Sequence, residues 1–124
     1  MNGEYRFLRT RDGVTSFASV TVELQPSSIY SVTSDNLIYN DSEELYNGFY
    51  NTALAEGVEI AARAHEQRGG EPQHVEIVKL HATLIDSRAD AVRCATALAT
   101  WKALGHSEDE VNVLFANGEW RVEF

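Results

Sequence analysis

The sequence is poor in cysteine, in proline and in long apolar runs. Its one cysteine, Cys94, excludes an intrachain disulfide, and a lone cysteine in an alanine-rich segment is typical of a small core residue. No apolar run approaches the length of a membrane-spanning helix, and the residues after Met1 are too polar for a secretory signal. These absences predict a cytoplasmic protein with no membrane segment.

Basic residues are scarce too. The chain has 10 Lys and Arg against 19 Asp and Glu, which gives a formal net charge of -9, and no basic residue lies between Arg11 and Arg63. A phosphate backbone repels such a body, and nucleic-acid-binding domains normally carry an excess of basic side chains. RNA and the ribosome are therefore disfavoured as partners by net charge.

Motifs that carry catalysis are missing as well. The sequence has no P-loop of the GxxxxGK[ST] type, and its four histidines have neither HxH nor HExxH spacing. No local Ser/His/Asp or Cys/His arrangement exists, and Ser87 is better explained as a helix cap. His81, on the less apolar face of a strand, is the histidine to inspect, although a structural role is favoured. We predict no enzymatic activity, no cofactor and no metal.

The patterns that are present predict a folded α+β protein. A chain of 124 residues with 44% hydrophobic residues fits a single domain, residues 1–124. Residues 5–10 and 17–25 predict strands joined by a hairpin turn at Asp12-Gly13. One face of the second strand is apolar: Ala18, Val20, Val22 and Leu24.

Two helices are predicted after these strands. The first begins at Asp41 or Ser42 and runs to residue 67, where Gly69-Gly70 ends it. Gly57 lies in its stripe of small residues, which predicts a close approach to a neighbouring element. The second helix begins at Ser87, with Asp90 as a capping-box-like partner.

Further strands complete the pattern. A third strand is predicted at 29–32, before a polar loop at 34–41, and a central strand at 75–85. Asn117-Gly118 predicts a type I′ hairpin at the C-terminus. The apolar face of the central strand is predicted to hold Val78, Leu80, Ala82 and Leu84. The order β-β-β-α-β-α-β-β indicates a mostly antiparallel sheet with two helices packed on one face.

Several of these segments resemble domain IV of translation elongation factor G and related ribosomal GTPases. The matching positions are residues 17–26, Phe49-Tyr50, Ala53-Leu54, Gly57-Val58, Asp86-Ser87 and the alanine-rich residues 95–102. The resemblance covers most of the chain. It implies the fold of ribosomal protein S5 domain 2, with a left-handed βαβ crossover that departs from the usual handedness.

The sequence also departs from this family where the family acts on the ribosome. The glycine-rich loop before the long strand is reduced to Asp12-Gly13, and Ile85 runs almost directly into Asp86-Ser87, where the family has a histidine-containing loop. His81 lies earlier, within the strand, and does not replace it. The chain therefore resembles a free-standing domain IV with shortened tip loops.

Two surfaces are candidates for binding. If the turns at Arg11 and at Arg88 lie at one end of the sheet, then Arg9, Arg11 and Arg88 form a cationic tip; otherwise they are ordinary surface arginines. An aromatic patch is the second candidate, because aromatic residues are enriched at interface cores. Its members are Tyr39, Tyr46, Phe49 and Tyr50.

The last strand leaves two alternatives open. Trp120, Val122 and Phe124 share one face, which either pairs with a second copy at a sheet edge or packs as core under the helices.

We predict a non-enzymatic binding module that contacts a protein partner or its own copy, the latter as a homodimer. A translation-associated RNA or ribosome binder is the alternative that a basic tip would favour. An enzyme or small-ligand binder, with a site that the sequence does not reveal, is the alternative that a deep pocket enclosing His81 or tyrosines would favour.

Overall fold

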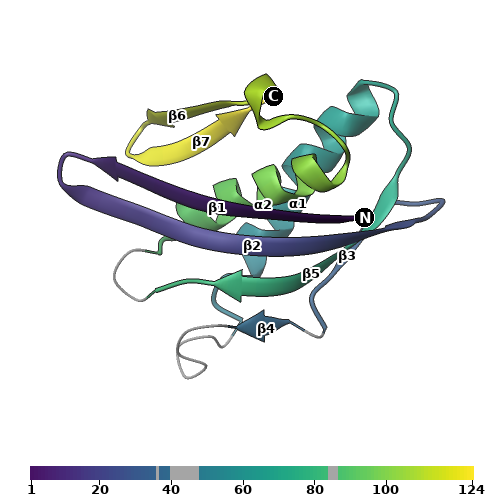
Figure 1. Cartoon of the computed structure of the whole chain (residues 1–124), viewed down its shortest axis with the longest axis horizontal. Coiled ribbons are helices and arrows are strands. Elements are labelled where there is room, and N and C mark those ends of the chain that lie inside the picture. The colour runs from purple at the N-terminus through teal and green to yellow at the C-terminus, as the bar shows by residue number, and fades with distance from the viewer. Residues whose placement is uncertain (36, 40–47, 84–86) are drawn as a thin grey trace.

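The structure is a computed structural model that describes residues 1–35, 37–39, 48–83 and 87–124. Its fold is α+β, as predicted, with two helices behind one face of a mixed, mostly antiparallel sheet (Figure 1). The sheet has the order β1-β2-β5-β3, and β4 also pairs with β5. Its strands are β1 (Asn2–Arg11), β2 (Val14–Pro26), β3 (Ser31–Thr33), β4 (Ile38–Tyr39) and β5 (Gln73–His81).

The strands of the sheet pair in both antiparallel and parallel directions. β1, β2 and β5 are antiparallel neighbours, whereas β3 and β4 run parallel to β5. The third strand, predicted at 29–32, is found at Ser31–Thr33. The segment predicted as a loop contains a further strand, β4, because its backbone pairs with Lys79 and Leu80. The left-handed crossover stays a prediction.

The remaining elements lie on the helix side of the sheet. They are α1 (Asn51–Gln67), α2 (Ala89–Ala103), the short 3-10 helix η1 (Glu108–Glu110), β6 (Asn112–Ala116) and β7 (Glu119–Glu123). β6 and β7 form a sheet of their own rather than an edge of the main sheet. Trp120 meets Phe7 edge to face with ring centres 5.8 Å apart, and Phe124 lies 4.6 Å from Trp101. The apolar face of the last strand therefore packs on its own chain.

The alternation in β2 produces the buried face that the sequence predicts. Ala18, Val20 and Val22 are fully buried against the helices, while Ser19 and Thr21 lie on the opposite face. Both hairpin turns are also confirmed. Asp12 and Gly13 have φ of 53° and 78°, and Asn117 and Gly118 have 55° and 81°, as a type I′ turn requires.

The prediction for the central strand was wrong at Val78. The pairing of β2 with β5 passes from Thr21–Lys79 to Val22–Ile77, which leaves Val78 as an extra residue in a β-bulge. The inward residues are therefore Val75 and Ile77 before the bulge and Leu80 after it. Leu84, also predicted on this face, lies outside the described residues.

Glycines allow the helical layer to approach closely. A Cβ at Gly57 would lie 2.6 Å from the carbonyl oxygen of Arg93, so α1 and α2 touch at this point, as predicted. A Cβ at Gly3 would overlap the carbonyl oxygen of Ala99, which brings β1 equally close to α2. The core beside these contacts contains many alanines.

Both helices begin later than predicted. Gly48 has a φ of 72°, which a right-handed helix does not contain, and α1 begins at Asn51. The predicted caps Asp41 and Ser42 lie outside the described residues. Ser87 does not cap α2: its Oγ accepts a hydrogen bond from the Thr83 amide at 2.7 Å and donates one to the Phe17 carbonyl at 2.6 Å.

Candidate functional site

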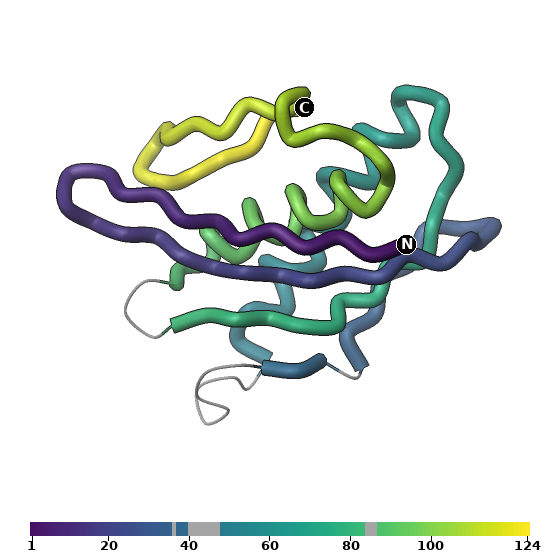
Figure 2. The backbone as a smooth tube through the Cα atoms, in the orientation of Figure 1, coloured from purple at the N-terminus to yellow at the C-terminus, as the bar shows by residue number. Residues whose placement is uncertain are grey.

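Two of the three predicted tip arginines meet at one end of the molecule. The β1–β2 turn, the start of α2 and the β6–β7 turn lie at the same end of the chain trace (Figure 2). Arg11 and Arg88 line a concavity of about 160 Å³ there, together with Phe115 and Trp120. We call these four residues the arginine–aromatic end. Arg9 does not line it.

The charges at this end are partly matched. Arg11 lies 3.9 Å from the Asp12 carboxylate, and its Cζ lies 4.5 Å from the centre of the Phe115 ring. Arg88 lies 3.8 Å from Asp90. Arg9 instead lies over the Phe7 ring and donates a hydrogen bond of 3.1 Å to the Leu8 carbonyl. The predicted three-arginine tip is therefore an arginine pair with one separate neighbour.

A buried carboxylate fixes the hairpin at this end. Asp90 is 4% exposed, and its two oxygens accept hydrogen bonds of 2.9 Å from the amides of Ala91 and Trp120. The negative charge near the start of α2 also complements the helix dipole. Asp90 thus joins the start of α2 to β7 and positions Trp120 in the concavity.

The predicted aromatic patch divides among different surroundings. Phe49 is 74% exposed, but Tyr50 is buried and donates a hydrogen bond of 3.1 Å to the Ser87 carbonyl. Burial raises the pKa of the Tyr50 hydroxyl, so it stays protonated. Tyr39 is half-buried in β4, and Tyr46 lies outside the described residues. The described aromatic residues therefore do not form one exposed surface.

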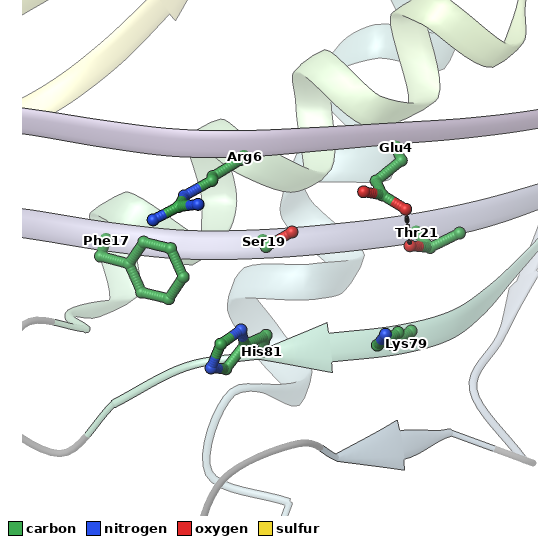
Figure 3. A pocket seen from close by; sticks show the side chains of 7 residues that line it. All are labelled: Glu4, Arg6, Phe17, Ser19, Thr21, Lys79 and His81. Atoms are coloured by element: carbon green, nitrogen blue, oxygen red, sulfur yellow. Dashed lines mark hydrogen bonds between the residues drawn. The ribbon is translucent and has the colours of Figure 1, made fainter.

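A second concavity lies on the face of the sheet that the helices leave open. It measures about 250 Å³ and is drawn in Figure 3. We call it the sheet-face concavity. Its lining residues come from β1, β2 and β5: Glu4, Arg6, Phe17, Ser19, Thr21, Lys79 and His81.

The strand register explains this hollow. Arg6 lies opposite Ser19, and Ser19 lies opposite His81, so the three form one row across the sheet. Glu4, Thr21 and Lys79 form the next row. In both rows β2, which lies between β1 and β5, has a short side chain between two long ones. Because neighbouring strands are only about 4.8 Å apart, the long side chains stand around a floor of hydroxyl groups.

Phe17 supports one side of the sheet-face concavity. The guanidinium of Arg6 lies 5.3 Å from the centre of its ring, and the His81 ring meets it edge to face at 5.1 Å. At the opposite side the Thr21 hydroxyl donates a hydrogen bond of 3.2 Å to the Glu4 carboxylate (Figure 3). Of this group, only His81 was predicted from the sequence as a candidate. Alternation places Lys79 beside it, but no local signal aligns Arg6 with them.

The remaining candidates for reactive chemistry are the cysteine and possible metal ligands. Cys94 is fully buried, and burial raises the pKa of its thiol to about 12, which does not suit a nucleophile at neutral pH. Within the described residues, no group of three or more His, Cys, Asp or Glu is arranged to hold a metal ion. The same part of the chain contains no helix long and apolar enough to cross a membrane.

Comparison with known proteins supports the fold. Among the solved structures of similar fold is the crystal structure of ttk003000868 from Thermus thermophilus. It matches with a TM-score of 0.68 and 20% sequence identity, over 84% of this chain and 15% of that one. This chain therefore corresponds to a small part of the Thermus protein, and at this identity the likeness shows the fold alone. No protein-family model matches the chain, and a comparison with curated proteins gives no match.

Proposed function

We propose that this protein is a non-catalytic, cytoplasmic binding module that contacts a protein partner through its arginine–aromatic end. We also propose that the chain resembles domain IV of elongation factor G. The arginine–aromatic end would then correspond to the tip of that domain. One observation carries the proposed function. Two arginines and two aromatic rings line a single concavity, and Val14, which also lines it, is 58% exposed.

These residue types are the ones that protein interfaces favour. Trp, Phe and Arg are enriched in interface cores and supply much of the binding energy. Arg11 has an apolar contact on the Phe115 ring and a polar edge beside Asp12, so it presents both kinds of surface. A fitting partner is a protein segment with an apolar side chain beside a carboxylate.

RNA binding through the same end is the second candidate. Arginine and aromatic side chains together also suit single-stranded RNA. The net charge of -9 opposes it, and both arginines lie within 4 Å of a carboxylate. We therefore rank it below a protein partner.

Quantitative capture from a lysate of the source cells tests the proposal. The tagged full chain is compared with Arg11→Glu and Val14→Glu, which change exposed side chains at the proposed surface. Arg63→Glu is the matched control, because Arg63 is a 72% exposed residue of α1 away from that end. A partner lost with the first two variants and retained with the control supports the proposal. A captured set that is the same in all four samples rejects it.

Two further measurements separate the alternatives. Co-sedimentation with ribosomes at physiological salt, abolished by Arg11→Glu, would favour the RNA candidate. Light scattering at micromolar concentration tests self-association. A mass near 13.8 kDa would remove the homodimer. A dimer that Val14→Glu dissociates would make the second copy the partner.

A further inference from the structure

The basic side chains of this protein fall into two groups. Of the ten Lys and Arg residues, eight have a hydrogen bond or an ion pair: Arg9, Arg11, Arg63, Arg68, Arg88, Arg93, Lys102 and Arg121. Arg6 and Lys79 have neither with any described residue, and both line the sheet-face concavity. In a chain with 19 acidic residues, the two cations without a hydrogen bond or an ion pair among the described residues thus lie at one place.

The histidines divide in the same way. His65 and His106 lie 2.8 Å apart and share a hydrogen bond, and His74 is bonded to Ser31 at 2.7 Å. His81, also at the sheet-face concavity, has no hydrogen bond or ion pair with the described residues; its contact is the Phe17 ring. The basic side chains that lack a polar partner within the described chain therefore meet at one site.

From this convergence we propose that the sheet-face concavity binds a small phosphate monoester. Arg6 and His81 stand on either side of Ser19, and Lys79 stands in the next row, so donors surround a hydroxyl floor (Figure 3). Guanidinium, ammonium and hydroxyl groups are the donors that bind phosphate oxygens. This site is separate from the arginine–aromatic end and does not depend on the function proposed for it.

The size and surroundings of the site select the ligand. Its volume of about 250 Å³ lies below the roughly 300–1,000 Å³ of pockets for drug-sized ligands, so a phosphate with a small substituent fits. Phe17 is only 7% exposed and is already covered by Arg6 and His81, which leaves no open ring for a nucleobase to stack on. A single RNA strand is therefore a poorer fit than a small monoester.

Glu4 gives the site an internal control. Its carboxylate lies at one side of the concavity and repels an anion, while accepting a hydrogen bond from Thr21. Glu4→Gln keeps an oxygen for that bond and removes the charge. It should tighten phosphate binding about threefold, whereas loss of Arg6 or Lys79 should weaken it about tenfold or more.

Amide chemical shifts measured by NMR during titration test the proposal. The probes are inorganic phosphate, glycerol 3-phosphate and acetate, each compared with sodium chloride at equal ionic strength to remove screening effects. We expect both phosphates to shift amides around Ser19 and His81 with saturation, and acetate to bind more weakly. Arg6→Ala and Lys79→Ala should reduce the affinity, and Arg63→Ala, with the same charge change on α1, should not.

Three results would overturn the proposal. The first is a titration in which neither phosphate gives shifts beyond those of sodium chloride. The second is an equal loss of affinity in Arg63→Ala and Arg6→Ala, which would indicate the general charge of the protein rather than a site. In the third, a single-stranded RNA oligonucleotide shifts these amides and the monoesters do not, which would make the open face a surface for a strand.

Discussion

The two faces of the main sheet are made by the same strands and are organised by different rules. The face under α1 and α2 is apolar and close-packed, with Phe7, Val20 and Ile77 almost wholly buried. The open face is built in rows across the strands, with short hydroxyl side chains between long charged ones. The packing of the covered face is determined by the size and apolar character of each side chain. The character of the open face is determined by which side chains the strand register brings together.

The covered face contributes stability, and the open face carries charged side chains. On the covered side, the contacts at Gly3 and Gly57 leave no room for a methyl group, so packing determines the stability. On the open side, Arg6 and Lys79 have no polar partner among the described residues. The proposed phosphate site rests on this lack of polar partners.

Two phenylalanines test this difference most strongly. Phe7 is 0% exposed on the covered face and Phe17 is 7% exposed on the open face. Phe7→Ala should cost about 3–5 kcal/mol, because it leaves a cavity in a rigid core. Phe17→Ala should cost less, about 1.5–3 kcal/mol, because water can fill the space it leaves. Urea unfolding of both variants measures the difference, and equal losses would contradict the distinction between the faces.

The helix contact at Gly57 should give the next largest effect. Gly57→Leu should destabilise the protein by about 1–3 kcal/mol, because the side chain meets the backbone of α2. The control is Ala55→Leu, the same residue introduced at an exposed position of the same helix. A melting temperature for Gly57→Leu that equals the control would show that the two helices are not in this contact.

A smaller effect is expected from pH, again on the helix side. The pKa of His106 is lowered, first by burial and then by the neighbouring His65, and Trp101 stacks on its ring with centres 3.9 Å apart. Protonation therefore favours the unfolded chain. The stability contribution is complete above about pH 6.5 and is lost as the pH falls from there to the lowered pKa.

Denaturant unfolding over a pH series checks this sign. His106→Gln should lose less stability than the original protein as the pH falls below about 6.5. Curves that stay parallel through this range would exclude His106 as the source. The Glu110 carboxylate lies 4.0 Å from His106 and has a lowered pKa of its own, so its loss appears at more acidic pH and is distinguishable.

The smallest effect is expected on the open face. Lys79→Ala should change the free energy of unfolding by less than about 0.5 kcal/mol, since its side chain has no polar partner to lose among the described residues. Arg6→Ala should cost up to about 1 kcal/mol, because it also removes the contact of the guanidinium with the Phe17 ring. Arg93→Ala is the comparison, because Arg93 is mostly buried and lies 3.4 Å from Glu119. A larger loss for Arg6 or Lys79 than for Arg93 would assign the open-face cations a structural role.

Local signals predicted much of the fold. The type I′ turns, the buried face of β2 and the end of α1 at Gly69 all follow from a few adjacent residues. The start of α1 did not, because the turn at Gly48 interrupts an otherwise helical pattern. Ser87 looked like a cap but is bonded to the carbonyl of Phe17, seventy residues away, which no local pattern reveals.

The sites were less predictable because they depend on pairing between distant strands. In the sequence, Arg9 and Arg11 look alike, because they are two positions apart in one strand. In the structure, Arg9 lies over the Phe7 ring and Arg11 lies over the Phe115 ring. Arg6 and His81 become neighbours only through Ser19, after the register of three strands is set. Composition identifies such residues as surface charges and cannot show that they meet.

The bulge at Val78 has a consequence for changes in chain length. A one-residue insertion or deletion within a strand normally exchanges its two faces. Val78 is already an extra residue opposite β2, so deleting it leaves Ile77 and Leu80 inward and Lys79 outward. The same deletion at Ser19 would move half of β2 to the wrong face. Deletion of the single codon for Val78 therefore leaves the buried residues of β5 buried and its exposed residues exposed.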